Sequence, residues 1–302
     1  MLSIKKYAAI DIGSNAVRLL ISNILEEKGK PVRFKKSSLV RVPIRLGADV
    51  FLNNEISSIN FARLQDTMFA FKLLMKSHNV VLYKACATSA MREAKNSKEV
   101  VKAIFELSKI EIEIINGEEE AAIIAATDLS NYIDNNRNYL YVDVGGGSTE
   151  FSVIRNGKVI ASKSFKIGTV RLLNNIVKEK TWTELKYWIK NNTKPYDKVE
   201  VIGSGGNINK IFKMSGKTIG KPLTYFYLSS LYHKLGSYTY EERITELDLN
   251  QDRADVIIPA TRIYLSAMKW SKAKHLFVPK IGLSDGIIKS IFNQTVSSKS
   301  LY

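Results

Sequence analysis

The stretch that decides the fold reads Tyr139-Leu-Tyr-Val-Asp-Val-Gly-Gly-Gly-Ser-Thr-Glu150. An apolar strand runs into an acid, three glycines, two hydroxyl residues and a second acid. Consecutive glycines let the backbone approach an anion closely, and the exposed N–H groups of such a turn converge on phosphate oxygens. Asp143 and Glu150 are hard oxygen ligands of the kind that hold Mg²⁺ beside substrate phosphates. The stretch therefore predicts a phosphate and metal site, with a solvated glycine-rich turn as the plainer alternative.

The same pattern occurs about 130 residues earlier, in Tyr7-Ala-Ala-Ile-Asp-Ile-Gly-Ser-Asn15. In both places an apolar strand delivers an acid into a glycine turn, and a second apolar run follows. A strand, turn and returning strand that recur in this way indicate an internal repeat. The expected fold is α/β, with two similar lobes that face each other across a phosphate-binding cleft, as in actin, Hsp70 and sugar kinases. Two unrelated hairpins are the alternative.

Length and composition are those expected of a two-domain cytoplasmic enzyme. The chain has 302 residues, of which 45% are hydrophobic, and no apolar run approaches the roughly 20 residues that span a bilayer. The N-terminus reads as a strand rather than a signal peptide. A single cysteine, Cys86, excludes an intrachain disulfide, and three scattered histidines exclude a His/Cys metal centre. We interpret Cys86 as a core residue rather than a nucleophile.

The formal charge of +16 is compatible with binding to nucleic acid, to an anionic membrane or to a small polyanionic substrate. It is also compatible with a proteome that is generally rich in lysine. The lysines are spread along the chain and are not interleaved with aromatic residues, and no RNA- or DNA-binding motif is visible. We therefore expect neither a nucleic acid nor a membrane partner. A polyphosphate chain or a highly phosphorylated nucleotide would profit from such a field.

Hydrophobic periodicity predicts alternating helices and strands. The first lobe is expected to span residues 1–124 and the second 125–302. The predicted helices lie at 59–77, 98–108, 118–129, 170–177 and 182–190, with a further helix at the C-terminal end. Beyond the two hairpins, the predicted strands lie at 80–87, 110–115, 198–203 and 275–278.

An ordered set of motifs resembles the exopolyphosphatase and guanosine pentaphosphate phosphohydrolase family in its short, two-domain form. Besides the two turns already quoted, the set comprises Ala87-Thr-Ser-Ala-Met-Arg92, Ile115-Asn-Gly-Glu-Glu-Glu120-Ala, Gly203-Ser-Gly-Gly-Asn207, Arg253-Ala-Asp-Val-Ile-Ile-Pro259 and Leu283-Ser-Asp-Gly286. The resemblance implies two ribonuclease-H-like lobes of the actin superfamily and removal of a terminal phosphate. It also implies a link to the stringent response and a possible homodimer. The absence of the helical domains of longer relatives suggests shorter polyphosphates, a nucleotide, or a groove completed by a second subunit.

The resemblance also assigns roles to individual residues. Glu120 would position and activate water, in competition with Glu118 and Glu119, whereas Asp143 and Glu150 would hold Mg²⁺. The expected phosphate-binding residues are Asp11, Gly13, Ser14, Asn15, Arg18, Arg92, Gly145, Gly146, Gly147, Ser148 and Thr149. The expected contacts to the distal part of the substrate are Gly203, Ser204, Gly205, Gly206 and Asn207.

These observations predict a Mg²⁺-dependent exopolyphosphatase, a hydrolase that removes the terminal phosphate of inorganic polyphosphate. Guanosine pentaphosphate 5′-phosphohydrolase is the alternative enzyme. A sensor that binds guanosine tetraphosphate without turnover would keep the glycine turns but would not need Glu120. An ATP-dependent kinase would form ADP in the presence of an acceptor, and a nucleic-acid binder would show affinity that falls steeply with salt.

Overall fold

The structure is a computed structural model that describes residues 2–125, 127, 134 and 136–299. The chain divides into two compact units, and we describe each by itself. Unit 1 comprises Met1–Thr127 and Leu283–Tyr302, and unit 2 comprises Asp128–Gly282.

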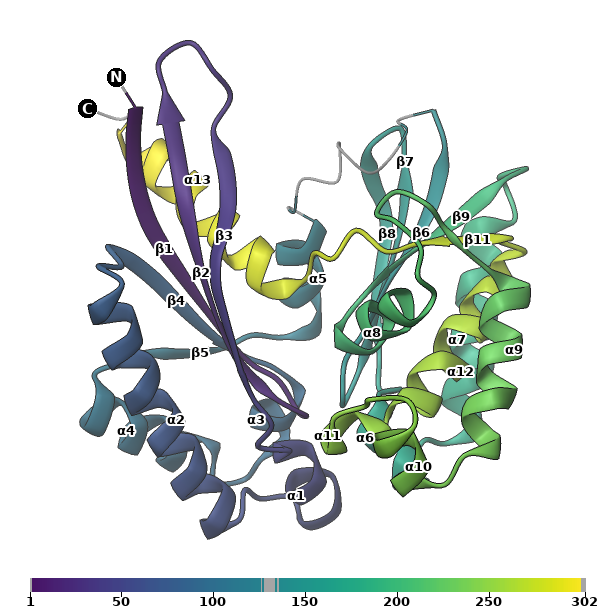
Figure 1. The fold of residues 1–302 in the computed structure, drawn as a ribbon, viewed down its shortest axis with the longest axis horizontal. Helices are drawn as coiled ribbons and strands as arrows, with labels where there is room; N and C mark the ends of the chain where they lie inside the picture. The colour runs from purple at the N-terminus through teal and green to yellow at the C-terminus, as the bar shows by residue number, and fades with distance from the viewer. Residues whose placement is uncertain (1, 126, 128–133, 135, 300–302) are drawn as a thin grey trace. The chain divides into compact units, whose positions relative to one another are not determined.

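Unit 1 is built on a five-stranded sheet with the order β3-β2-β1-β4-β5 (Figure 1). The first three strands are antiparallel, and β1, β4 and β5 run parallel. The second half of β1 is buried throughout because helices cover both faces of the sheet at this point. The strands are β1 (Leu2–Ile12), β2 (Val17–Glu27), β3 (Arg33–Val42), β4 (Leu82–Ala87) and β5 (Ile112–Ile114).

Successive residues of β1 point to opposite faces of this sheet. Ala8, Ile10 and Ile12 belong to the core that also contains Leu64 and Met68 of α2. Asp11 therefore points to the other face. The helices of unit 1 are α1 (Leu46–Asn53), α2 (Ser58–Ser77), α3 (Ser89–Glu93), α4 (Ser97–Ser108), α5 (Gly117–Ala125) and α13 (Leu283–Lys299).

The C-terminal helix α13 differs from our expectation, because the predicted range 125–302 assigned it to the second lobe. In the structure it packs on β1, β2, β4 and α5 of unit 1. Asp285 forms an ion pair with Lys36 of β3 at 2.8 Å, and the rings of Phe292 and Phe34 meet edge to face with centroids 5.4 Å apart. At Gly286 a Cβ would lie 2.3 Å from the carbonyl oxygen of Ile123, so glycine is required for α13 to approach α5. The motif Leu283–Gly286 forms the first turn of this helix.

Unit 2 repeats the sheet of unit 1 and adds one strand at the edge. Its order is β10-β11-β9-β6-β7-β8, with β6, β7 and β8 antiparallel and with β6, β9 and β11 parallel. Five strands therefore follow the same order in both units, which confirms the predicted duplication. The strands are β6 (Asn138–Val144), β7 (Thr149–Arg155), β8 (Lys158–Phe165), β9 (Val199–Ser204), β10 (Leu223–Thr224) and β11 (His275–Phe277).

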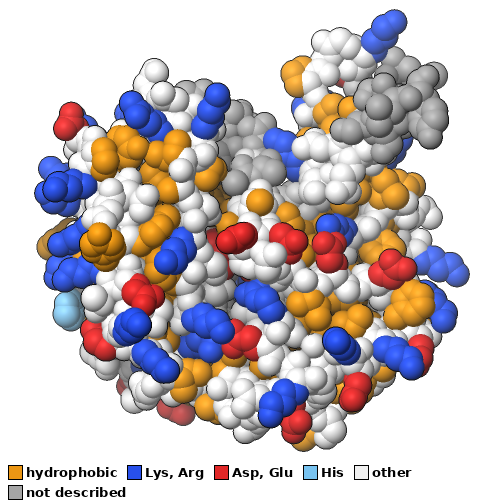
Figure 2. All heavy atoms as spheres, turned by 180° about the vertical axis from the view of Figure 1, so that it is seen from behind, with side chains coloured by type: hydrophobic (Ala, Val, Ile, Leu, Met, Phe, Trp, Pro, Cys, Tyr) orange, Lys and Arg blue, Asp and Glu red, His pale blue; other side chains and the backbone are white. Residues whose placement is uncertain are grey.

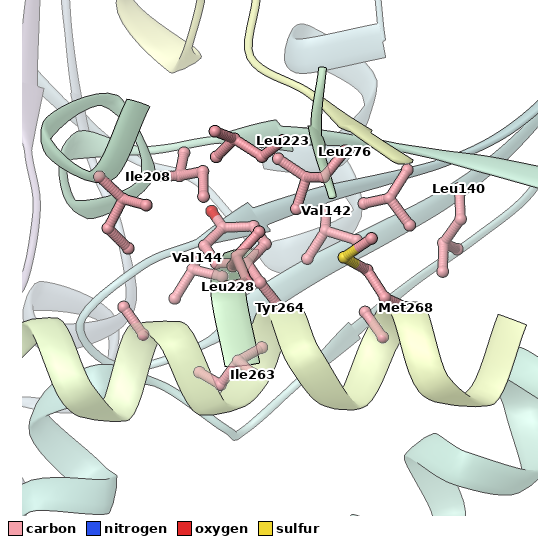
Figure 3. Close-up of a cluster of buried hydrophobic side chains, with 14 of the residues drawn as sticks. Leu140, Val142, Val144, Ile208, Leu223, Leu228, Ile263, Tyr264, Met268 and Leu276 are labelled. Carbon is pink, nitrogen blue, oxygen red and sulfur yellow. The ribbon is translucent and has the colours of Figure 1, made fainter. Parts of the chain in front are cut away.

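The core of unit 2 lies between this sheet and helix α12. Leu140, Val142 and Val144 of β6 point toward Ile263 and Tyr264 of α12 (Figure 3). Full burial of each such aliphatic side chain contributes about 1.5–3 kcal/mol. The alternate residues of β6, among them Asp143, point to the opposite face. The helices are α6 (Thr169–Leu173), α7 (Glu179–Thr193), α8 (Gly206–Met214), α9 (Tyr225–Ser237), α10 (Tyr240–Thr245), α11 (Gln251–Ala254) and α12 (Ile257–Ser271).

The predicted helices and strands are confirmed within the described residues, with ends that differ by a few positions. The helix predicted for 118–129 is α5 up to Ala125, and most of the remaining range lies outside the described residues. None of the described helices is long and apolar enough to cross a membrane. On the face shown in Figure 2, Lys and Arg side chains are dispersed among acidic and hydrophobic ones rather than gathered in one patch.

Candidate functional site

The glycine turn between β6 and β7 is held from behind by helix α6. The carbonyl oxygen of Gly145 accepts the N–H of Thr169 at 3.0 Å, and that of Gly146 accepts the N–H of Val170 at 2.9 Å. The carbonyl oxygen of Gly147 accepts a hydrogen bond from Nε of Arg171 at 2.7 Å. All three glycine carbonyls therefore point toward α6.

This arrangement determines where the amide hydrogens of the turn point. In a planar trans peptide the C=O and N–H groups point in opposite directions. Because the three carbonyls face α6, the N–H groups of Gly146, Gly147 and Ser148 are directed away from it. Successive N–H groups with a common direction form an anion-binding concavity.

Gly168 and Arg171 make this geometry possible, and neither residue is among those predicted from the sequence. A Cβ at Gly168 would lie 2.3 Å from the carbonyl oxygen of Gly146, so a glycine is required where α6 meets the turn. In unit 1, Gly47 lies in the first turn of α1, which contacts the first glycine turn, and a Cβ there would lie 2.9 Å from Cβ of Ser14. A glycine after the third strand of each repeat is the signal that could have revealed this contact.

Asp143 and Glu150 lie directly opposite each other on β6 and β7, so their side chains share one face of the sheet. Glu150 is 2% exposed, and its Oε1 accepts hydrogen bonds from Oγ of Ser148 at 2.7 Å and Oγ of Ser164 at 2.9 Å. Asp143 is half-buried. Two neighbouring carboxylates at the end of a sheet, one of them oriented by hydroxyl groups, are suited to a hard cation.

The acidic pair fits Mg²⁺ in one particular binding mode. Within the described ranges, no group of three or more His, Cys, Asp or Glu side chains is placed to hold a metal. The described residues therefore do not form a site in which protein side chains alone coordinate the metal. Mg²⁺ is commonly held by one or two carboxylates together with substrate phosphates and water, and Asp143 with Glu150 match that donor set.

The turn Gly203–Asn207, which we predicted to contact the distal part of the substrate, lies beside Asp143. Strands β6 and β9 are parallel neighbours, and Asp143 is paired in register with Ser204. Gly205 has a φ of +116°, and a Cβ there would lie 2.9 Å from the carbonyl oxygen of Val144 and 3.4 Å from Oδ1 of Asp143. The carboxyl ends of β6 and β9 therefore bring both glycine turns together.

Tyr264 of α12 supports the turn Gly203–Asn207 through a hydrogen bond. Its hydroxyl group donates a hydrogen bond to the carbonyl oxygen of Ser204. Burial, and then the charge of Asp143, hold the pKa of Tyr264 well above its usual value, so the phenol stays protonated and continues to donate. Oγ of Ser204 donates to the carbonyl oxygen of Ile281 at 2.8 Å.

The first glycine turn, between β1 and β2 of unit 1, is closed by a hydrogen bond from the N–H of Gly13 to the carbonyl oxygen of Ala16 at 3.1 Å. The carbonyl oxygens of Ser14 and Asn15 accept the N–H groups of Gly47 at 2.7 Å and Arg45 at 3.0 Å, at the start of α1. This turn is therefore also held from behind by the helix that follows the third strand.

Polar side chains around this first turn are engaged with one another. Oδ2 of Asp11 accepts a hydrogen bond from Nη1 of Arg18 at 2.8 Å, and the Asp11 side chain is 5% exposed. Oγ of Ser14 and Oγ of Ser89 share a hydrogen bond of 2.8 Å. Asp11 and Arg18 thus form an ion pair across β1 and β2. Their phosphate-binding roles stay predictions.

Helix α5 separates three consecutive glutamates by environment. Glu118 and Glu119 are exposed, whereas Glu120 is 8% exposed. Oδ1 of Asn116 accepts the N–H groups of Glu118 and Glu119, both at 2.9 Å, and Oε2 of Glu119 accepts the N–H of Asn116 at 2.8 Å. The first two glutamates therefore belong to the start of the helix, with Glu119 completing a capping box, and Glu120 is turned inward.

Arg92 is tied to the segment that leads into α5. Its Nη1 donates to the carbonyl oxygen of Ile115 at 2.5 Å. This contact links α3 to the segment just before the helix that carries Glu120. The predicted role of Arg92 as a phosphate clamp stays a prediction.

Cys86 is a core residue, as interpreted from the sequence. Its side chain is buried, and burial raises the pKa of the thiol to about 12. The charge of Lys84 opposes this shift, whereas the charges of Glu113, Asp11 and Glu120 add to it. A thiol that stays protonated at neutral pH is a poor nucleophile.

Residues 38–295 match the sequence model of the Ppx/GppA phosphatase family. A bifunctional 3-dehydroquinate synthase/phosphatase of Fusobacterium nucleatum is 32% identical over 202 residues, which are 62% of this chain and 30% of that protein. Exopolyphosphatase 2 of Mycobacterium tuberculosis is 29% identical over 57% of this chain and 54% of its own length. A guanosine-5'-triphosphate,3'-diphosphate pyrophosphatase of Aliivibrio fischeri is 28% identical over 60% of this chain and 35% of its own length. The chain thus matches about a third to a half of these curated relatives.

Among solved structures, the chain resembles the Aquifex aeolicus member of the Ppx/GppA protein family with a TM-score of 0.76 and 25% identity, over 97% of this chain and 99% of that one. An exopolyphosphatase from Cytophaga hutchinsonii has the same fold, with a TM-score of 0.83 and 21% identity over 96% of this chain and 98% of that one.

Proposed function

Because the chain belongs to the Ppx/GppA phosphatase family, we propose that it is an exopolyphosphatase that releases orthophosphate from the end of inorganic polyphosphate. The observation that carries this proposal is the turn at Gly145–Thr149. Its carbonyls are bound to α6, its N–H groups point away from α6, and Asp143 and Glu150 flank it. An anion cradle beside two carboxylates suits a substrate that is a phosphate chain with a bound cation.

The proposed phosphate ligands in unit 2 are the N–H groups of Gly146, Gly147 and Ser148. In unit 1 we assign the same role to residues of the first turn and to two arginines, as expected from the sequence: Gly13, Ser14, Asn15, Arg18 and Arg92. Fixed donors of this kind hold the terminal phosphoryl group without reorganising during the reaction, and such positioning is the larger part of phosphoryl-transfer catalysis.

Asp143 and Glu150 would hold Mg²⁺. The ion supplies positive charge that offsets the charge of the phosphate oxygens and of the leaving phosphate. Ser148 and Ser164 keep the Glu150 carboxylate in place through their hydroxyl groups. Glycine is required at position 205 beside Asp143, because its φ is +116° and a Cβ there would lie 2.9 Å from the carbonyl oxygen of Val144.

Glu120 is assigned to water activation. Its carboxylate orients a water molecule toward the terminal phosphorus and accepts the proton of that water as the new P–O bond forms and the bridging P–O bond breaks. Orthophosphate and a chain shorter by one phosphate are the products. A positioned general base contributes typically 10²–10⁴-fold to such a step.

Guanosine pentaphosphate 5′-phosphohydrolase is the second candidate. Its substrate has the same terminal phosphoanhydride, and the likeness to the Aliivibrio fischeri guanosine-5'-triphosphate,3'-diphosphate pyrophosphatase over 60% of this chain favours it. A guanosine tetraphosphate sensor without turnover is the outcome in which neither substrate is hydrolysed although the nucleotide binds.

The test compares phosphate release from short-chain polyphosphate and from guanosine pentaphosphate, in the presence of Mg²⁺. Wild type should act faster on polyphosphate, and Glu120→Gln should reduce both rates by at least about 100-fold. Glu118→Gln is the matched control, because Glu118 is exposed on the same helix and should leave the rates unchanged. Faster release from the nucleotide would establish the second candidate. Equal loss in both variants would refute the role of Glu120.

A further inference from the structure

A second candidate binding surface lies at the β10 edge of the unit 2 sheet. A cavity of about 630 Å³ opens there between the N-terminal turn of α9 and the C-terminal end of α12. We call it the β10 groove and define it by Tyr225, Phe226, Lys269, Lys272, Lys274 and His275. None of these residues belongs to the glycine turns or to the acidic pair.

The β10 groove carries positive charge without a carboxylate among its lining residues. Lys269, Lys272 and Lys274 are exposed, and in the part of the chain that the structure describes no ion pair engages them. One acid contacts a lining residue: Oε1 of Glu200 lies 3.2 Å from Nδ1 of His275. The groove therefore suits an anionic ligand with several charges.

Two aromatic rings lie next to these lysines. Phe226 is 83% exposed and Tyr225 is 37% exposed. Lysines near the end of α12 are explained by the negative end of the helix dipole, but an exposed phenylalanine is not. Flat apolar rings in a basic groove are typical of surfaces on which nucleic-acid bases stack.

The rings and the lysines are fixed relative to one another by the backbone. The N–H of Tyr225 donates to the carbonyl oxygen of Lys274 at 3.1 Å, and Thr224 pairs with His275 in the β10–β11 ladder. The side chain of Thr224 also caps α9 by accepting the N–H of Tyr227 at 3.2 Å. Backbone hydrogen bonds therefore join the two sides of the β10 groove.

We propose that the β10 groove binds single-stranded nucleic acid, with its lysines at the phosphates and with Phe226 and Tyr225 stacked on bases. Inorganic polyphosphate could satisfy the lysines, but it has no flat apolar group for the rings. This inference replaces the sequence-based expectation of no nucleic acid partner, which rested on lysines that were not interleaved with aromatics along the chain. It does not depend on the proposed phosphatase activity.

The test is fluorescence anisotropy of the full chain with a labelled oligouridylate of about ten nucleotides. Three lysine–phosphate contacts predict a slope of about −2 for the logarithm of the binding constant against the logarithm of salt concentration. Phe226→Ala should weaken binding about tenfold, because stacking is lost, and Phe226→Tyr should restore it. Lys272→Ala combined with Lys274→Ala should weaken binding and make the slope less steep by about 1.4.

Matched controls lie on α7, where Lys186 is exposed and Tyr187 is 69% exposed. Lys186→Ala and Tyr187→Ala should leave the binding constant unchanged. An abasic oligonucleotide of the same length should bind about as weakly as the intact probe binds to Phe226→Ala.

Three results would overturn the proposal. They are no binding of the oligouridylate at low salt, equal binding of the abasic probe, and insensitivity to Phe226→Ala in a variant whose melting temperature matches wild type. Phosphate release from polyphosphate by Phe226→Ala should equal that of wild type. Failure of nucleic-acid binding is thereby distinguished from failure of the phosphatase proposal.

Discussion

The two glycine turns are built on the same frame and differ in charge. Asp11 in unit 1 and Asp143 in unit 2 occupy the same place, near the end of the central strand. The residue opposite Asp11 is Arg18, whereas the residue opposite Asp143 is Glu150. One cross-strand position therefore makes the first turn a neutral ion pair and the second a pair of carboxylates.

The neighbouring parallel strand also differs between the two turns, whereas a supporting helix is common to both. Cys86 is paired in register with Asp11, and Ser204 occupies that place beside Asp143. Gly47 and Gly168 each let a helix approach the turn. A duplicated scaffold thus keeps the backbone contacts that shape the turn, while the side chain opposite the aspartate decides whether the site attracts a cation.

The largest expected effect comes from giving the second turn the charge pattern of the first. Glu150→Arg would allow an ion pair with Asp143 but would remove one of the two proposed Mg²⁺ ligands. Phosphate release should fall at least about 100-fold, because the charge at the phosphates is no longer offset by a metal. Steady-state assays across a Mg²⁺ titration measure this.

Arg18→Lys is the comparison for the first turn, because it keeps the positive charge that we assign to phosphate binding. It should retain most of the activity. If Glu150→Arg kept wild-type activity and Mg²⁺ dependence, the acidic pair would not be the cation site and the contrast between the turns would lose its functional meaning.

The two supporting glycines should differ in their sensitivity to alanine. At Gly168 the new Cβ would meet backbone at 2.3 Å, whereas at Gly47 it would first meet the ring of Phe51 at 2.7 Å. A side chain can rotate away more easily than backbone can shift. Gly168→Ala should cost about 2–3 kcal/mol of unfolding free energy and Gly47→Ala about 1 kcal/mol, as judged by urea denaturation. The reverse order would show that the backbone contact at Gly168 tolerates a side chain better than the contact at Gly47 does.

The ion pair of the first turn should contribute to stability rather than to turnover alone. Arg18→Ala leaves the buried carboxylate of Asp11 without this partner, at a cost of about 1–2 kcal/mol because Arg18 itself is 33% exposed. Adding Asp11→Asn should recover part of that loss. Thermal unfolding of the two single variants and the double variant measures the coupling, and strict additivity would mean that the pair contributes nothing.

The smallest effect at neutral pH is expected at Cys86. Burial raises the pKa of this thiol from 9.0 to about 12, so the native chain holds the proton more tightly than the unfolded chain does. The unfolding free energy should therefore be unaffected below about pH 9 and should fall between about pH 9 and 12. Cys86→Ser should flatten that fall, and alkylation of the native thiol at pH 8 should be slow. Rapid alkylation would place Cys86 outside the core.

Much of this fold was predictable because its signals are local. Apolar runs that end in an acid identified β1 and β6, and the glycine turns after Asp11 and Asp143 revealed the duplication. The three consecutive glutamates could not be separated by sequence, because all lie at the start of one helix. The structure distinguishes them by burial, which depends on what packs against α5.

The amino-acid sequence by itself determined the two α/β lobes, the repeated turn and the residue types that make one turn acidic and the other neutral. Turn chemistry and hydrophobic periodicity act within a few residues, so they can be read directly along the chain. Only the tertiary structure decided that α13 joins unit 1, that α6 orients the glycine amides and that Phe226 lies beside Lys272 and Lys274. Those outcomes depend on which surfaces remain open for packing once the strands have paired, and no local pattern records them.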